Sequence, residues 1–276
     1  MGLATTAFGT APVVATMIAV PAAAVVGLRF LFGAPLMLLV VLAGRRRLTP
    51  ADLRHSALGG LLLPIHVLLF YMAARRTSVA DVTFIMSLQP VLIFAAAPRL
   101  LGERVSSELA ALGALGIVGV GLVVYGSSRS GLAHPLGEAL AVANLLVWTS
   151  YLLASKRARR DGCVQALQYQ ACVNAVGAVV MAVVLFAVRP DLGGGATSDW
   201  IAIVYLTAIP GVAAHVLNNW AQRYIDQSAA SVILLGQPVL AGAGAAAFLD
   251  QPMGPLSLVG GLCVVAAAAV LVRRES

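Results

Sequence analysis

Long apolar stretches follow one another along almost the whole chain, and short polar connections separate them. A helix that crosses a bilayer needs about 20 mostly apolar residues. Ten stretches approach or reach that length, at roughly 3–20, 21–43, 52–74, 78–98, 107–125, 137–156, 164–188, 199–224, 228–249 and 255–272. The pattern therefore predicts an all-α integral membrane protein with ten transmembrane helices.

Two short phrases recur in the same order, once in each half of the chain. They are His66-Val-Leu, which returns at His215, and Gln89-Pro-Val-Leu, which returns at Gln237. The His-to-Gln separation is 23 residues in the first half and 22 in the second. Ordered phrases at matched spacing indicate a duplicated unit. We expect a first repeat at 1–125, a linker at 126–136 and a second repeat at 137–276.

The number of predicted helices in each repeat decides how the repeats are related. Five is odd, so the second repeat would enter the membrane from the side opposite to the first. Many secondary transporters contain such repeats, related by a pseudo-twofold axis in the membrane plane, with the substrate site near the midplane between them. We therefore expect two inverted five-helix repeats whose Gln-Pro helices run antiparallel.

Composition strengthens the membrane prediction. The chain is 60% hydrophobic and 11% charged, whereas soluble proteins are about 45–50% apolar and about 25% charged. The formal net charge is +7, but 17 of the 18 basic residues lie at or near the ends of apolar stretches. That placement is typical of membrane flanks and not of a nucleic-acid-binding face. The expected partners are a lipid bilayer and a small molecule, with no nucleic acid.

The basic residues also predict an orientation. Thirteen lie in the even-numbered connections and the C-terminus, and four lie in the odd-numbered connections. Cytoplasmic loops carry the excess of Lys and Arg. We expect a multi-pass protein of the cytoplasmic (inner) membrane with both termini in the cytoplasm.

Several kinds of chemistry are absent from the sequence. Cys163, Cys172 and Cys263 form no CxxC pair and no cluster with histidine, so we expect packing residues and no metal site. The glycine-rich stretch 113–121 lies within an apolar helix and follows no strand, which favours close helix packing over a nucleotide loop. No GxxxxGK[ST] motif or catalytic constellation occurs. We expect no cofactor and no enzyme activity.

The repeated Gln-Pro pairs are the first candidates for a binding site. A proline inside a helix frees a carbonyl about one turn earlier, and lipid tolerates this only where the break faces protein or water. The neighbouring glutamine adds two donors and an acceptor. We expect Gln89 and Gln237 to contact substrate and Pro90 and Pro238 to kink their helices. The alternative is a packing kink whose glutamine bonds to the next helix.

His66 and His215 are the next candidates, each shortly after a further predicted kink at Pro64 or Pro210. A titratable side chain inside a membrane helix is a functional candidate. Both histidines are candidates for substrate binding and for proton coupling. Interhelical hydrogen bonding is the alternative.

Two charged residues are candidates for proton coupling or gating. Arg29 is the one basic residue well inside an apolar stretch, where insertion costs about 2.5 kcal/mol or more. It could hold a substrate carboxylate or phosphate, hold the carbonyls of a broken helix, or extend toward the interface, and we favour a structural or gating role. Asp81 could carry a proton, although a capping box with Ser78 explains it more simply.

Polar positions on two helices complete the candidate site. His215, Asn218, Asn219 and Gln222 follow i, i+3, i+4, i+7 spacing and share one helix face. Such a stripe should face a cavity or a partner helix. Asn144, Trp148 and Tyr151 share a face of another helix. Neutral amides beside aromatic rings suit a small polar or amphipathic metabolite better than an inorganic ion, but they could equally serve as helix-packing contacts.

These phrases resemble the EamA-type drug/metabolite transporters over essentially the whole chain. The matching segments are Tyr71-Met-Ala-Ala, Thr77-Ser-Val-Ala, Gln89-Pro-Val, Leu101-Gly-Glu-Arg, Asn219-Trp-Ala, Ala229-Ala-Ser, Gln237-Pro-Val and Gly260-Gly. The second half departs from the Gly-Glu turn with Asp250-Gln-Pro. The resemblance implies ten helices, two EamA repeats and the carriage of small metabolites, often outward.

The sequence thus predicts a secondary transporter that exports a small polar or amphipathic metabolite by alternating access. Two alternatives stay open. One is a flippase for a lipid-linked intermediate, and the other is a membrane accessory protein without transport activity. The oligomeric state is open as well.

Overall fold

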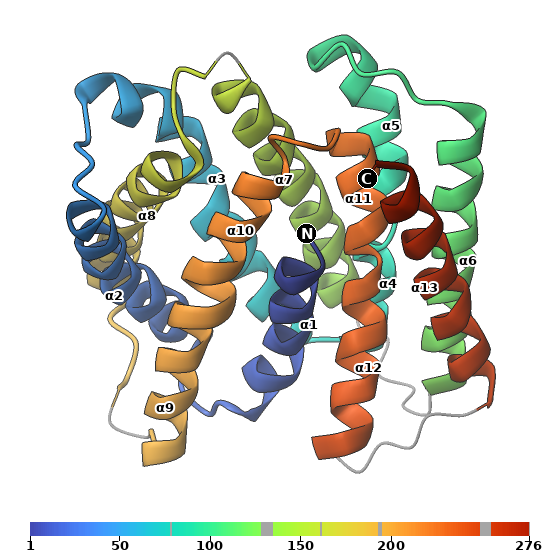
Figure 1. Ribbon diagram of the computed structural model, residues 1–276. Coiled ribbons are helices and arrows are strands. Elements are labelled where there is room, and N and C mark those ends of the chain that lie inside the picture. Colours follow the sequence, from blue (N-terminus) through green and yellow to red (C-terminus); the bar gives the residue numbers. More distant parts are fainter. Residues whose placement is uncertain (78, 128–134, 161, 193–194, 249–254, 276) are drawn as a thin grey trace.

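The computed structural model describes residues 1–77, 79–127, 135–160, 162–192, 195–248 and 255–275. All regular elements in these residues are helices (Figure 1): α1 (Gly2–Met17), α2 (Ala22–Ala43), α3 (Pro50–Ala74), α4 (Val79–Met86), α5 (Gln89–Leu100), α6 (Ser107–Ser127), α7 (Pro135–Arg159), α8 (Ala166–Val188), α9 (Thr197–Leu206), η1 (Thr207–Ala213), α10 (Ala214–Ala221), α11 (Gln227–Leu234), α12 (Gly236–Phe248) and α13 (Pro255–Glu275). The all-α prediction is confirmed for the described residues.

Six helical segments are long and apolar enough to cross a membrane, at Ala22–Ala43, Pro50–Ala74, Val82–Leu100, Pro135–Arg159, Ala166–Val188 and Thr197–Ala221. Four shorter apolar helices lie at Gly2–Ala15, Ser107–Leu122, Gln227–Ala241 and Leu258–Leu271. Together the two sets fall on the ten stretches expected from the sequence. A count of exactly ten spans stays a prediction.

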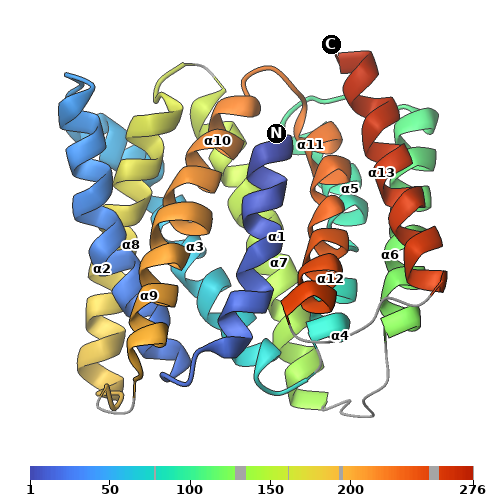
Figure 2. The same ribbon diagram turned by 60° about the horizontal axis from the view of Figure 1, so that its bottom comes forward.

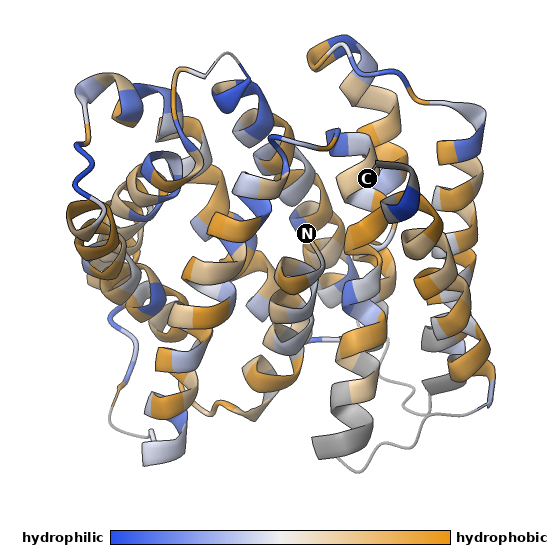
Figure 3. Ribbon diagram, in the orientation of Figure 1, coloured by the Kyte–Doolittle hydropathy of each residue, from blue (hydrophilic) through white to orange (hydrophobic). Residues whose placement is uncertain are grey.

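The outer surface of the bundle suits a lipid environment. Large apolar side chains such as Leu39, Val183, Phe186 and Leu262 are more than half exposed. Hydrophilic residues gather mainly at the end that carries the α5–α6 and α10–α11 connections (Figure 3). Apolar surface of this extent is rare on soluble monomers, so the bundle belongs in a bilayer.

Local signals set several helix ends. Thr49 and Asp52 form a reciprocal capping box at the start of α3, with the Asp52 N–H donating to Thr49 Oγ1 at 3.2 Å and the Thr49 N–H donating to Asp52 Oδ2 at 2.8 Å. Pro50 fills the first helical position, where its missing N–H is not needed. After α5, Gly102 has φ +68°, a conformation that favours glycine, and the chain turns there toward α6.

Equivalent helices of the two halves make equivalent contacts with the opposite half. The first helix of each half packs on the third and fourth of the other, so α1 contacts α10 and α12 while α7 contacts α3, α4 and α5. The second helices, α2 and α8, pack together, as do the fifth helices, α6 and α13. The paired helices α6 and α13 run in opposite directions (Figure 2). This arrangement fits the inverted two-repeat architecture expected from the sequence.

The helices that carry the Gln-Pro phrases are interrupted where continuous, kinked helices were expected. α4 ends at Met86 and α5 begins at Gln89, so Pro90 occupies the first turn of a new helix. α11 ends at Leu234 and α12 begins at Gly236, which places Pro238 in the first turn there too. A proline is well tolerated in a first turn because those N–H groups have no intrahelical acceptor.

The other two predicted kinks differ from each other. α3 continues through Pro64, which is buried inside it. Pro210 lies within the π-helical segment η1, which joins α9 to α10 inside the helical span Thr197–Ala221, where one helix was expected at 199–224. π-helical turns are rare and often mark functional sites, and η1 lies beside the cavity described below.

The glycine-rich stretch of α6 packs closely on α13, as expected. A Cβ atom added at Gly119 would lie 2.7 Å from the carbonyl oxygen of Gly260 and 2.9 Å from a Val264 methyl carbon. A backbone oxygen cannot move aside as a flexible side chain can. Only glycine therefore allows α6 and α13 to approach this closely at position 119.

We expect Gly119→Ala to destabilise the bundle by about 1–3 kcal/mol, because the added methyl group overpacks the α6–α13 contact. Thermal unfolding in detergent measures the effect. Gly121→Ala is the matched control, since its Cβ would meet a Phe84 ring carbon at an ordinary 3.5 Å. Equal melting temperatures for the two variants would contradict the close α6–α13 contact.

Candidate functional site

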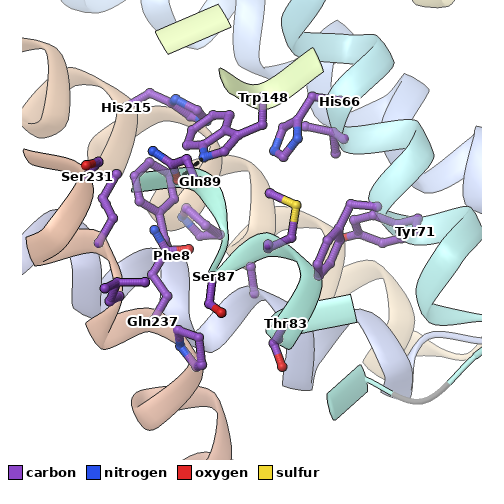
Figure 4. A pocket seen from close by; sticks show the side chains of 18 of the residues that line it. Phe8, His66, Tyr71, Thr83, Ser87, Gln89, Trp148, His215, Ser231 and Gln237 are labelled. Atoms are coloured by element: carbon purple, nitrogen blue, oxygen red, sulfur yellow. Dashed lines mark hydrogen bonds between the residues drawn. The ribbon is translucent and has the colours of Figure 1, made fainter. Parts of the chain in front are cut away.

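A cavity lies between the two halves of the bundle (Figure 4). It is lined by Phe8, Ala11, Arg29, His66, Val67, Phe70, Tyr71, Thr83, Met86, Ser87, Gln89, Trp148, Pro210, His215, Ser231, Leu234, Leu235, Gln237 and Pro238. The space open to the centre of a water molecule is about 110 Å³. A single buried water needs about 10–15 Å³ of such space, so the cavity has room for several waters or a small solute.

Both Gln-Pro phrases reach this cavity. Gln89 and Gln237 line it from the two helix interruptions, one in each half of the chain. The Gln89 side-chain carbonyl accepts a hydrogen bond from Trp148 Nε1 at 3.0 Å. Gln89 Nε2 is buried and has no hydrogen-bond partner among the described residues. The two repeated amides thus come together at one place, and Gln89 keeps a donor available.

An aromatic wall forms one side of the cavity, and Trp148 is its centre. The Trp148 ring stacks on His66 with centroids 4.4 Å apart and on Tyr151 with centroids 5.4 Å apart. Phe8 and His215 contact the same ring edge-on, at 6.1 Å and 6.0 Å. Such a wall gives a ligand a broad apolar contact surface with hydrogen-bonding groups at its edges.

The two repeated histidines lie on opposite sides of Trp148 and both line the cavity (Figure 4). His66 Nδ1 donates to Asn144 Oδ1 at 2.6 Å, and Asn144 Nδ2 donates to the Met86 sulfur at 3.2 Å. That bond leaves His66 Nε2 as the acceptor of a neutral imidazole. His215 Nδ1 is buried without a hydrogen-bond partner in the described part of the chain.

The polar stripe on the eighth predicted helix divides between two environments. His215 lines the cavity, whereas Asn218, Asn219 and Gln222 are buried outside its lining. Asn219 and Gln222 belong to a group of hydrogen-bonded side chains from three helices. We call this group the α7–α8–α10 polar cluster, and its members are Ser155, Arg159, Gln170, Asn219 and Gln222.

Asn219 joins three helices in this cluster. Its side chain accepts from Ser155 Oγ at 3.0 Å and donates to Gln170 Oε1 at 2.9 Å. Arg159 Nη2 donates to Gln222 Oε1 at 2.6 Å. Tyr151, although stacked on Trp148, donates to Gln170 at 3.4 Å and does not line the cavity. In this conformation these residues hold helices together.

The remaining predicted residues are placed as follows. Arg29 is buried, lines the cavity and donates to Tyr71 Oη at 3.2 Å, so it does not extend to the interface. Pro210 and Pro238 line the cavity, whereas Pro64 and Pro90 are buried outside its lining. The side chain of Asp81 lies outside the described residues, as does Ser78.

Sequence reasoning missed several lining residues, including Phe8, Tyr71, Thr83 and Ser231. One signal for the last two was available. Thr83 precedes Gln89 by six residues, and Ser231 precedes Gln237 by six, so each repeat carries a hydroxyl at the same position. Met86 and Leu234, three residues before each glutamine, also line the cavity.

The cavity offers hydrogen bonds, aromatic contact and one positive charge. In the part of the chain that the structure describes, no three His, Cys, Asp or Glu side chains gather into a metal-binding group. The groups present are suited to holding a small solute between two helix interruptions that face each other across the halves.

The comparisons with known proteins match this architecture. The model of the EamA-like transporter family matches residues 1–125 and 135–273. A solved structure titled "Crystal structure of protein" has a similar fold, with a TM-score of 0.78, 22% sequence identity and coverage of 98% of each chain. At that identity the likeness shows the fold alone. No curated protein matches the sequence. The two family matches, one in each half, cover nearly the whole chain, which therefore belongs to the EamA-like transporter family of membrane transporters in the drug/metabolite superfamily.

Proposed function

We propose that this chain is a secondary transporter that exports a small polar or amphipathic metabolite across the cytoplasmic membrane by alternating access. It would cross the membrane ten times, as two inverted repeats at 1–125 and 137–276 joined by a linker at 126–136, with both termini in the cytoplasm. One observation carries the proposal. Both copies of the Gln-Pro phrase begin a helix after an interruption, and both face the same cavity between the halves.

Substrate would bind in that cavity. Gln89 and Gln237 supply amides from the two repeats, while Trp148 and His66 supply the aromatic surface. A helix interruption is a natural pivot, because the few residues between two half-helices can absorb a change in backbone angles. The α4–α5 and α11–α12 interruptions would act as such pivots on the two sides of the bound solute.

Alternating access also needs contacts that close one end and can open. The α5–α6 and α10–α11 connections lie at the same end of the bundle (Figure 1). Glu103, in the α5–α6 connection, binds the start of α11 there. Its carboxylate accepts from the N–H of Gln227 at 2.8 Å, the N–H of Ser228 at 3.0 Å and Ser228 Oγ at 2.8 Å. Lys156 Nζ lies 3.8 Å from Glu103 Oε1. We call this set the Glu103 lock.

The lock joins the two halves at the end that the basic residues assign to the cytoplasm. Glu103 belongs to the first family match, and Gln227, Ser228 and Lys156 belong to the second. A carboxylate at a helix N-terminus is stabilised by the free N–H groups and by the helix dipole. We propose that the lock is formed when the cavity is closed to the cytoplasm and broken when it opens there.

Proton coupling would use the two histidines. His66 and His215 both line the cavity, and each holds a ring nitrogen that the described hydrogen bonds leave unused. Either could take a proton as a solute enters or leaves. A pH-sensitive dye inside the vesicles of the next experiment reports this coupling.

The test is solute counterflow in proteoliposomes that contain only the purified chain, with pooled amino acids, nucleosides, sugars and organic acids. We expect saturable flux that a trans solute stimulates. Gln89→Ala/Gln237→Ala should lower this flux at least tenfold at an unchanged melting temperature, because both cavity amides are lost.

Gln165→Ala, which changes an exposed amide at the start of α8, is the matched control and should keep full flux. Normal flux in the double variant would reject the site. A lower melting temperature with no flux in any protein would instead favour an accessory protein, and movement of labelled lipid alone would favour a flippase.

A further inference from the structure

Arg29 introduces a positive charge into an otherwise neutral cavity. Its side chain is 8% exposed and comes from the middle of α2. Among the described residues that line the cavity none is acidic, and the other polar ones carry amides, hydroxyls and imidazoles. Burying one charge without a counter-charge costs several kcal/mol. The described lining therefore holds a cation and no counter-charge.

The protein contacts of Arg29 leave most of its guanidinium available. Among the described residues its hydrogen bonding consists of one bond, from Nη1 to Tyr71 Oη at 3.2 Å, and a guanidinium has five N–H donors. The Tyr71 ring also lies under the guanidinium, 5.9 Å from Arg29 Cζ to the ring centroid. Tyr71 holds the cation in place through its ring and hydroxyl but brings no negative charge.

The acidic residues of the described chain lie elsewhere. The ion pair they form is that of Glu103 with Lys156, at the Glu103 lock. Asp52 and Asp199 are engaged at the starts of α3 and α9. In the described part of the chain, no carboxylate oxygen comes within 4.0 Å of the Arg29 guanidinium. The missing counter-charge can thus come from a bound solute.

We propose that the transported substrate carries a carboxylate or phosphate group and that Arg29 binds this group inside the cavity. This inference rests on the proposed transport function. A planar guanidinium matches either anion with two parallel hydrogen bonds, and such bonds are stronger where water is excluded. The rest of the substrate would lie against the aromatic wall around Trp148. A cationic solute would be repelled by Arg29.

The first test is direct binding to the purified transporter in detergent, measured by isothermal titration calorimetry. Each probe is an anion paired with a neutral analogue: indole-3-acetate with indole-3-acetamide, which replaces the carboxylate, and phenyl phosphate with phenol, which lacks the phosphate. We expect the anion of at least one pair to bind at least tenfold more tightly than its neutral partner. The pair that responds tells carboxylate from phosphate recognition.

The second test changes the cation. Arg29→Gln should remove the preference for anions, a loss of at least tenfold, while Arg29→Lys keeps the charge and should retain part of it. If Arg29→Gln fails to fold, the comparison of anionic and neutral probes on the parent protein still decides. Equal binding of both members of each pair, or an unchanged preference in folded Arg29→Gln, would overturn the inference.

A third variant tests whether the protein itself supplies the counter-charge. Asp81→Asn should leave anion affinity unchanged, and a tenfold gain would assign the counter-charge to Asp81 and overturn the inference. Binding tests the Arg29 site and counterflow tests transport, so the two hypotheses can be rejected independently. Anion binding without flux would reject transport and keep the Arg29 site, whereas equal flux of the anionic and the neutral member of each pair in the parent protein would keep transport and reject the anionic substrate.

Discussion

Replacing Glu103 by glutamine should open the end of the bundle where α5 meets α11. The carboxylate accepts three hydrogen bonds from Gln227 and Ser228 and lies beside Lys156. Glutamine offers one acceptor oxygen in place of two and no charge. Hydrogen bonds to charged groups contribute about 1.5–3 kcal/mol each. Losing the equivalent of one such bond shifts the open–closed equilibrium by about tenfold or more.

The opening can be followed from the cytoplasmic side of the membrane. A reporter thiol at the cavity, Ser231→Cys, is placed in a background in which Cys163, Cys172 and Cys263 are replaced by serine. We expect a membrane-impermeant maleimide to label this reporter at least tenfold faster when Glu103→Gln is added. Glu108→Gln is the matched control, since it removes an exposed carboxylate from the start of α6. Equal labelling rates in the two variants would show that Glu103 does not hold this end closed.

The sequence predicted the bundle because the bilayer imposes a simple rule. Apolar stretches of spanning length form helices, since lipid satisfies no backbone hydrogen bond. The repeated phrases added long-range information that a single stretch lacks. His66 with His215, and Gln89 with Gln237, were expected together because a duplicated unit places equivalent residues equivalently, and all four line one cavity.

The sequence marked the prolines at which helices could break, but it could not tell the form of each break. An apolar stretch has the same composition whether its helix continues through a proline, as at Pro64, or starts anew there, as at Pro90. The outcome depends on whether neighbouring helices satisfy the freed backbone groups. The π-helical segment around Pro210 could not be predicted from the sequence either, because it depends on how this helix packs against its neighbours.

The polar stripe shows a second limit. Helical spacing put His215 and Asn219 correctly on one face of their helix, but that face crosses from the cavity into the α7–α8–α10 polar cluster. Spacing predicts direction around a helix and says little about what lies at each level along it. Phe8 lines the cavity but was not predicted to, because an aromatic residue in an apolar helix does not stand out from its neighbours in the sequence.

A covalent bridge in place of the Glu103 lock should stop transport altogether. Glu103 Oε2 and Ser228 Oγ are 2.8 Å apart, so the tips of the two side chains touch across the halves. Glu103→Cys/Ser228→Cys, in the same cysteine-free background, lets a short bis-methanethiosulfonate reagent join the halves. A carrier that must open this end in every cycle cannot turn over while it is bridged. The single variants treated with the same reagent control for modification alone.

The measurement that tests alternating access most directly is therefore counterflow by one proteoliposome preparation before bridging, after bridging and after reduction. Alternating access predicts saturable flux before bridging, flux at the level of empty liposomes after bridging, and recovery of the first rate when the bridge is reduced. Flux that continues at its original rate through fully bridged protein would contradict it, because solute would then cross without the halves separating at the Glu103 lock.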